Sequence, residues 1–237
     1  AGARTAIGTF GGALASFRPA ELGAIVIREA IDRAGVTGAD VQNVVIGTVV
    51  PTQPKDAYVS RVAAVNAGIP TDAPAMNVNR LCGSGLQAIV SAAQAIALGE
   101  HDVAVAGGAE SMSNAPHMVL SARNGQKMGN IEMVDAMLGA LHDPFENIHM
   151  GVTAENVAER CGISREEQDA VAVESHKRAA AAIAAGYFKE QIVPVEIKTR
   201  KGVTIFDTDE HVRADASLEG MGGLRPVFKK DGTVTAG

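Results

Sequence analysis

The chain has 237 residues, of which 46% are hydrophobic and 20% are charged, and its formal net charge is −6. Nucleic acids are bound through a surplus of Lys and Arg that neutralises phosphates, so this acidic balance argues against a nucleic-acid partner. The two cysteines cannot form a disulfide framework, and no Cys/His cluster has metal-ligand spacing, so no metal site is expected. No apolar run of about 18 residues or secretory signal is present, which predicts a cytoplasmic protein without membrane contact.

The first hundred residues alternate between helix and strand patterns. Aromatic residues are only 3% of the chain, so thin layers of small and branched side chains are expected. A helix is predicted over 19–34, with Pro19 in its first turn and Gly35 after its end. A buried strand at 44–46, a second helix over 57–67 and a short strand at 75–79 follow.

The most informative segment is the turn at 79–85, which leads into a helix over 86–98 and a strand at 103–106. This helix has a broad apolar face made of Leu86, Ile89, Val90, Ala93, Ile96 and Ala97. The alternation predicts an α/β fold with a mostly parallel sheet covered by helices on both sides. In such sheets ligand sites lie beyond the carboxyl ends of the strands, where we expect Cys82.

The composition changes near residue 112. Methionines, glycines and histidines are scattered through His149, with little periodicity except around 131–141. A capping-box sequence at 164–167 opens a long helix to about residue 185, and short strands are expected at 193–197 and 203–206. We therefore predict two domains, a core domain over 1–112 and a second domain over 113–237.

Cys82 follows a strand and precedes a helix, which places its sulfur beside unpaired N–H groups and the positive end of the helix dipole. Gly83, Ser84 and Gly85 would leave room for a substrate, and backbone N–H groups of the turn could stabilise an oxyanion. These features favour a nucleophile over the alternative of a small buried hydrophobic residue. Cys161, at a helix end without such a turn, is interpreted as structural.

A dinucleotide-binding pattern overlaps the same turn. Residues 83–88 match G-x-G-x-x-A between a strand and a helix, with Asp102 about 20 residues further on. That pattern normally opens the first strand–helix–strand unit of a fold, whereas here it lies in the third, and Asp102 precedes its strand instead of ending it. The sequence therefore argues against a nicotinamide-dependent oxidoreductase.

The segments 79–88, Asn-Arg-Leu-Cys-Gly-Ser-Gly-Leu-Gln-Ala, and 107–113, Gly-Gly-Ala-Glu-Ser-Met-Ser, resemble the amino-terminal signature of thiolases. Segments 4–8, 61–68, 149–156 and 224–228 occur in the same order and with similar spacing, so the resemblance covers the whole chain. It is greatest to the bacterial acetyl-CoA acetyltransferases, or β-ketothiolases. The resemblance implies a thiolase-like layered fold with an inserted loop domain that binds coenzyme A.

The resemblance implies that Cys82 accepts an acyl group from one acyl-CoA and passes it to a second acyl-CoA. Coenzyme A and acyl-CoA are then substrates, and no prosthetic group or metal is needed. By position in the family pattern, the coenzyme site is implied to consist of Leu141, His149, Met150, Arg213, Phe228 and Ala236. Taken alone, His149 would be read as an ordinary loop histidine and Arg213 as part of a solvated face.

Two departures from the family pattern stand out. Relatives commonly carry a hydroxyl just before the methionine of the coenzyme loop, whereas this chain has Gly220 before Met221, so one contact is expected to be lost or made by backbone. Thiolases also continue into a second half that supplies a His, a second catalytic Cys and an Asn. None of those motifs occurs here, so the carboxyl-terminal half is expected to be absent from this chain and the active site to be incomplete.

The resemblance also implies a homo-oligomer, a dimer of dimers, in which residues 121–129 resemble the loop that pairs dimers. Two alternative functions remain open at this stage. One is a coenzyme-binding or assembly fragment of a thiolase-like protein without catalysis. The other is a ketosynthase-type condensing enzyme that takes carrier-bound acyl groups, against which the segment containing His149 and Arg213 argues.

Overall fold

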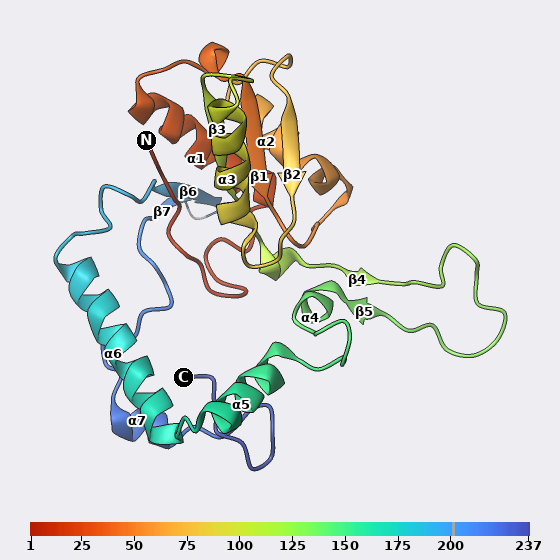
Figure 1. The fold of residues 1–237 in the computed structure, drawn as a ribbon, viewed down its shortest axis with the longest axis vertical. Coiled ribbons are helices and arrows are strands. Elements are labelled where there is room, and N and C mark those ends of the chain that lie inside the picture. Colours follow the sequence, from red (N-terminus) through yellow and green to blue (C-terminus); the bar gives the residue numbers. More distant parts are fainter. Residues whose placement is uncertain (201) are drawn as a thin grey trace. The chain divides into compact units, whose positions relative to one another are not determined.

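The described chain forms two compact units. The computed structural model describes residues 1–200 and 202–237 (Figure 1). The first unit contains residues 1–140 and 191–210, and the second contains residues 141–190 and 211–237. These units are defined by contacts alone, and the division into domains at residue 112 stays a prediction.

A three-stranded parallel sheet forms the centre of the first unit. Its strands β1 (Asn43–Gly47), β2 (Ala75–Val78) and β3 (Ala104–Gly108) are arranged in the order β2-β1-β3. Val44 of β1 pairs with Ala75 on one side and with Val105 on the other. Because the strands are parallel, their carboxyl ends meet at one edge of the sheet.

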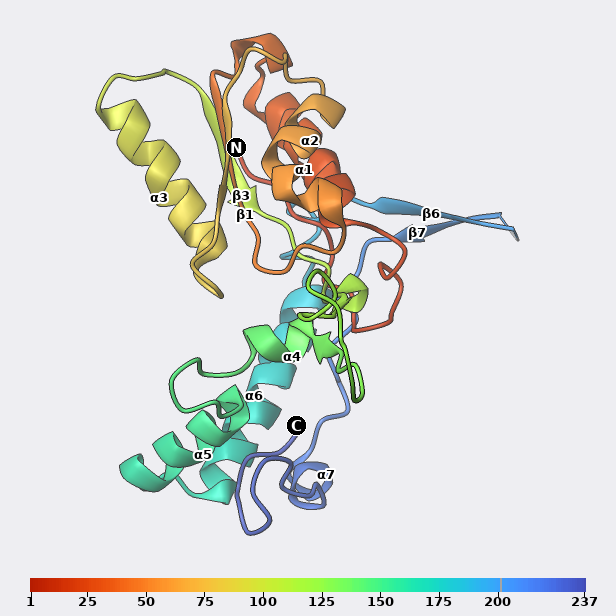
Figure 2. The ribbon, with the colours of Figure 1, turned by 90° about the vertical axis from the view of Figure 1, so that its right-hand side faces the viewer.

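Helices cover both faces of this sheet (Figure 2). Helices α1 (Pro19–Ala34) and α2 (Val59–Asn66) lie on one face, and α3 (Ser84–Ala97) lies on the other. Each lies within a few residues of its predicted position, and α1 ends at Gly35 in the left-handed region, with φ of 69°. The prediction of a parallel α/β sheet covered on both sides is confirmed.

The alternation of side chains along β1 divides the core into two layers. Val44 and Ile46 are buried among the apolar residues of α1 and α2. Val45 points to the opposite face and packs against Ala88 and Ala92 of α3. A β1 strand buried on both faces explains its continuous apolar sequence.

Helix α3 contacts the sheet through its smallest side chains. Ala88 and Ala92 are buried, whereas Leu86 and Ile89 are 69% and 51% exposed. The broad apolar face expected from the sequence is therefore directed away from this sheet. Small residues on the contact face allow the helix axis to lie close to the strands, which explains why the larger side chains occupy the other face.

The remaining elements of the first unit are short. Residues 195–199 pair in antiparallel fashion with residues 202–206, close to the predicted strands. The short elements are the 3-10 helices η1 (Gly38–Asp40), η2 (Pro54–Tyr58) and η3 (Met112–Asn114), the strand pairs β4 (His117–Met118) with β5 (Val134–Asp135) and β6 (Val195–Thr199) with β7 (Gly202–Phe206), and helix α4 (Ala136–Ala140).

An ion pair joins the amino-terminal segment to the segment after β7. The Arg4 guanidinium donates two hydrogen bonds to the Asp209 carboxylate, at 2.8 and 3.0 Å. Asp209 also accepts the backbone N–H of Ile7 at 2.8 Å. The hydrogen bonds from the Arg4 side chain are the main reason why the pKa of Asp209 lies below its ordinary value. The N–H of Ile7 lowers this pKa as well, whereas partial burial raises it.

The second unit contains helices α5 (Met150–Cys161), α6 (Arg165–Ala184) and α7 (Leu218–Gly222). The predicted capping box of α6 is confirmed, because Ser164 and Glu167 each accept the other's backbone N–H. Cys161 is the last residue of α5 and is exposed. It lies at the carboxyl end of its helix, where no unpaired N–H groups are available.

We predict that Asp209→Asn lowers the free energy of unfolding by roughly 1–3 kcal/mol at neutral pH, because charged hydrogen bonds are lost. A depressed carboxyl pKa stabilises the fold above the unfolded pKa of about 3.9, and this contribution disappears as the pH falls through the folded pKa. The difference between variant and wild type, measured by urea unfolding, should therefore shrink below about pH 4. Asp207→Asn, at an exposed site two residues away, is the control, and an equal effect of the two substitutions would contradict the prediction.

Candidate functional site

Cys82 lies in the turn between β2 and α3, at the carboxyl edge of the parallel sheet. Gly83 is the N-cap of α3, so Cys82 immediately precedes the cap, and its side chain is exposed. The amino-terminal end of a helix presents N–H groups and a positive dipole. The predicted position of Cys82 is therefore found, and the alternative of a buried hydrophobic cysteine is wrong.

The Ser84 hydroxyl fixes the shape of this turn. It donates to the carbonyl of Leu81 at 2.6 Å and accepts the N–H of Arg80 at 2.9 Å, so it bridges both sides of Cys82. Leu81 has a φ of 47°, in the left-handed region that non-glycine residues rarely occupy. Such a conformation persists where surrounding contacts determine it, and here Asn79 also accepts the Leu81 N–H at 3.0 Å.

One expectation about the turn, that its N–H groups stabilise an oxyanion, does not hold for two of them. Ser84 is only 4% exposed, because its hydroxyl is turned inward, so its side chain does not occupy the space beside Cys82. The N–H groups of Gly83 and Ser84 donate to the carbonyls of Arg80 and Leu81, at 3.1 and 2.9 Å. Those two N–H groups close the turn and are not directed at an external oxyanion.

Neighbouring loops meet at the same edge of the sheet. A side chain at Gly47, the last residue of β1, would collide with the backbone of Ser84, so α3 begins in direct contact with that strand end. Glu110, just after β3, accepts the N–H groups of Val49 and Val50 at 2.7 and 3.1 Å. The Asn79 amide donates to the Val49 carbonyl at 3.4 Å, so the loop after β1 is linked to the cysteine turn.

In the second unit, a closed loop brings Leu141, His149 and Met150 together. The N–H of Met150 donates to the Leu141 carbonyl at 2.8 Å, and His142 forms an antiparallel bridge with His149. Within the loop, Asp143 accepts the N–H groups of two following residues at 3.0 and 2.6 Å. Leu141 is thus adjacent in space to the consecutive residues His149 and Met150, although the loop separates them in sequence.

His149 joins Phe228 to the start of α5. Its Nδ1 accepts the N–H of Gly151 at 3.0 Å and so caps the helix, which requires the proton to be on Nε2. Its ring stacks on Phe228 with centroids 4.9 Å apart and an interplanar angle of 19°. A side chain at Gly151 would overlap the Phe228 ring, so this close approach needs glycine there.

The other implied coenzyme residues lie in different segments of the second unit. Arg213 is exposed, and its backbone N–H donates to His176 Nδ1 of α6 at 3.1 Å. Ala236 is exposed as well. Gly220, where a hydroxyl was expected, lies in α7 with its N–H donating to the Ser217 hydroxyl at 3.2 Å.

A family model described as the amino-terminal domain of thiolase matches residues 1–237. The chain belongs to the thiolase family. Among its relatives, beta-ketothiolase BktB of Cupriavidus necator is 65% identical over the whole chain and 60% of its own length. Acetyl-CoA acetyltransferase of Chromobacterium violaceum is 50% identical over 99% of the chain and 60% of its own length. The chain thus spans about 60% of the length of these relatives.

Solved structures agree on the thiolase fold. The acetyl-CoA acetyltransferase of Bacillus anthracis matches with a TM-score of 0.96 and 46% identity, over the whole chain and 60% of that structure. A human mitochondrial 3-ketoacyl-CoA thiolase in complex with CoA matches with a TM-score of 0.95 and 40% identity, over the whole chain and 59% of that structure. At these identities the likeness extends beyond the fold to the sequence family.

The hydrogen-bonding roles of Ser84 and Glu110 at the turn and its neighbouring loop were not predicted from the sequence. Both residues fall inside the two quoted motifs, and Ser84 was expected only to leave room for a substrate. A hydroxyl six residues after β2 and a carboxylate two residues after β3 are signals that could have identified these roles, since backbone N–H groups at strand ends need acceptors.

No metal cluster or membrane helix is found in the described residues. Among residues 1–200 and 202–237, no group of three or more His, Cys, Asp or Glu side chains is arranged to hold a metal ion. No helix in that part of the chain combines the length and the apolar composition that crossing a membrane requires.

We predict that Ser84→Ala lowers the free energy of unfolding by about 1–3 kcal/mol, because the Arg80 N–H loses its acceptor and the Leu81 carbonyl loses one of its two donors. Urea unfolding followed by circular dichroism measures the change. Ser91→Ala, on the same helix, removes a hydroxyl that accepts a hydrogen bond from the Gln87 amide and should cost less than about 0.5 kcal/mol. Similar values for the two variants would show that the hydroxyl does not fix the turn.

Proposed function

We propose that this chain is the nucleophile-bearing part of an acetyl-CoA acetyltransferase, which forms or cleaves the carbon–carbon bond of a 3-ketoacyl-CoA through an acyl-cysteine intermediate. The observation that carries the proposal is the exposed thiol of Cys82 at the amino-terminal end of α3, in a fixed turn of a thiolase domain. The names of the relatives support the acyl-CoA substrate class.

In the first half of the proposed reaction, the Cys82 thiolate attacks the carbonyl carbon of an acyl-CoA. A carbon–sulfur bond forms to Cys82, the bond to the coenzyme sulfur breaks, and coenzyme A leaves as a thiol after taking up one proton. In the second half, the α-carbon of another acyl-CoA loses a proton and attacks the acyl-cysteine, which releases Cys82. Dividing the transfer in this way replaces one difficult step by two easier ones.

The proposed coenzyme contacts are Leu141, His149, Met150, Arg213, Phe228 and Ala236. The stacked rings of His149 and Phe228, with Met150 next to them, offer an apolar surface of the kind that binds the pantetheine arm or adenine. Arg213 offers a guanidinium, which suits phosphate or the face of an adenine ring. A homo-oligomer, as a dimer of dimers, stays a prediction.

Replacing Cys82 with Ala in the complete gene product should abolish acyl-enzyme formation and lower kcat/KM at least roughly a thousandfold, because the nucleophile is removed. Mass spectrometry after mixing with acetyl-CoA would detect an acetyl group on the wild type and none on the variant. Cys161→Ala is the matched control and should acylate normally. An acetyl group retained on the Cys82→Ala protein would overturn the assignment of the nucleophile.

We expect the 237 residues on their own to show no measurable thiolysis of acetoacetyl-CoA. The resemblance assigns the general bases to a His and a second Cys in the part of the relatives that this chain does not span. Turnover by the complete gene product, together with none by this chain, would support the proposal. Turnover by these residues alone would contradict it, and no turnover by the complete product would favour a coenzyme-binding protein without catalysis.

A further inference from the structure

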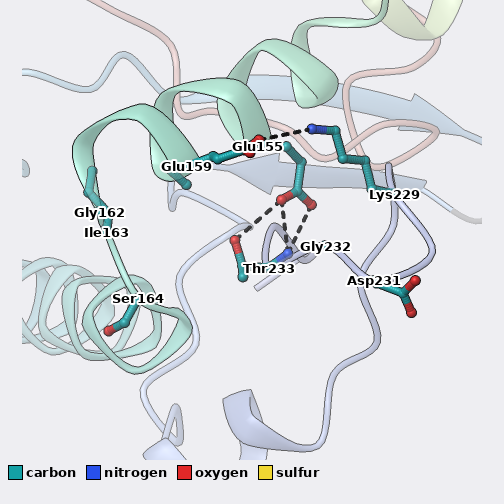
Figure 3. Close-up of a pocket in the computed structure, with 10 residues that line it drawn as sticks. Glu155, Glu159, Gly162, Ile163, Ser164, Lys229, Asp231, Gly232 and Thr233 are labelled. Atoms are coloured by element: carbon teal, nitrogen blue, oxygen red, sulfur yellow. Dashed lines mark hydrogen bonds and ion pairs between the residues drawn. The ribbon is translucent and has the colours of Figure 1, made fainter.

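A buried carboxylate on α5 has no place in the proposed reaction. Glu155 is 4% exposed and accepts hydrogen bonds from one short segment, residues 233–234 (Figure 3). The N–H of Thr233 lies 3.0 and 2.9 Å from its two oxygens, the N–H of Val234 lies 2.9 Å from Oε1, and the Thr233 hydroxyl lies 3.3 Å from Oε2. A charged acceptor of this kind makes strong hydrogen bonds, so Glu155 fixes the backbone at these two residues.

The segment that Glu155 fixes continues to Phe228. The N–H of Val227 donates to the Val234 carbonyl at 3.0 Å, and the N–H of Gly232 donates to the Lys229 carbonyl at 3.1 Å. Residues 227–234 therefore form a closed turn whose two ends are hydrogen-bonded to each other. Holding Thr233 and Val234 in place consequently holds the Phe228 ring in place.

Helix α5 contacts this turn at two levels. At its start, His149 stacks on Phe228, and six residues further on, about 9 Å along the helix axis, Glu155 holds the other end of the turn. A side chain at Gly232 would overlap the Glu155 carboxylate, so turn and helix are in close contact there. The ring is thus fixed by stacking on one side and by hydrogen bonds on the other.

The charges around Glu155 favour its ionised form. The hydrogen bond from the Thr233 N–H is the main reason why the pKa of Glu155 lies below its ordinary value. Burial raises this pKa, whereas the Val234 N–H, the Thr233 hydroxyl and the charge of Lys229 lower it. Lys229 donates to the Asn156 amide oxygen at 3.0 Å and lies 3.9 Å from a carboxylate oxygen of Glu159. Glu155 and Lys229 line a pocket together with Asp231, whose side chain is exposed (Figure 3).

We propose that Glu155 is a positioning residue for the coenzyme, which sets the place of the Phe228 ring through its hydrogen bonds to the 227–234 turn. The inference rests on the proposed function, in which Phe228 contacts coenzyme A. Glu155 itself does not touch the substrate. Its removal should therefore weaken coenzyme binding while leaving the acylation of Cys82 intact once the coenzyme is bound.

The test compares Glu155→Gln and Glu155→Ala with wild type in the complete gene product. Calorimetry with coenzyme A gives Kd, and steady-state kinetics with acetoacetyl-CoA give kcat and KM. For Glu155→Ala we expect Kd and KM to rise tenfold or more and kcat to stay within about twofold. Glu155→Gln keeps one carbonyl acceptor and should fall between Ala and wild type, a partial rescue.

Glu159→Gln is the matched control, one turn further along α5 with an exposed carboxylate, and it should bind coenzyme as wild type does. Amide hydrogen exchange at Thr233 and Val234 should be faster in Glu155→Gln than in wild type and Glu159→Gln. This second readout decides the matter if Glu155→Ala does not fold.

Phe228→Ala separates the two levels of the proposal. If Phe228→Ala binds coenzyme as wild type does, the proposed coenzyme site is wrong, and the positioning role falls with it. If Phe228→Ala binds weakly while folded Glu155→Gln shows unchanged Kd, KM and amide exchange, the site stands and the positioning role is overturned. A drop in kcat alone, with unchanged KM and Kd, would also overturn it.

Discussion

The close contact between helix α3 and the parallel sheet determines where the thiol of Cys82 lies. Ala88 and Ala92 pack on Val45, and Gly47 leaves room for the backbone of Ser84 at the end of β1. Larger side chains at these places would move the helix outward, because packed interiors do not absorb added volume without strain. Since Cys82 directly precedes the helix cap, any such shift would move its sulfur as well.

Helix α5 has a similar organising role within the second unit. Its cap, His149, stacks on Phe228, and its second turn carries the buried carboxylate of Glu155. The loop before the helix is closed by a hydrogen bond from the Met150 N–H to the Leu141 carbonyl, so these two residues lie side by side. One helix of 12 residues thus orders both the loop before it and the turn that reaches it from residues 227–234.

The elements with strong local signals could be predicted from the sequence. Helix α1 has Pro19 and Gly35 at its ends, and α6 has its capping box, so both were placed within a residue or two. The end of α5 at Cys161 was expected, but the Glu155 contacts could not be foreseen, because they depend on a segment 78 residues away in the chain. The outward direction of Leu86 and Ile89 was also missed, since periodicity identifies an apolar face but not the smaller face that packs on the sheet.

The hydrogen bonds of the Ser84 hydroxyl in the cysteine turn span four residues or fewer, since they reach only to Arg80 and Leu81. Closing so small a ring restricts little of the chain's freedom, so this geometry can form early and rebuild quickly after a disturbance. A short stretch of sequence therefore contains the hydroxyl bonds that shape the turn at Cys82, whereas the proposed coenzyme surface combines distant parts of the chain, since His149 stacks on Phe228.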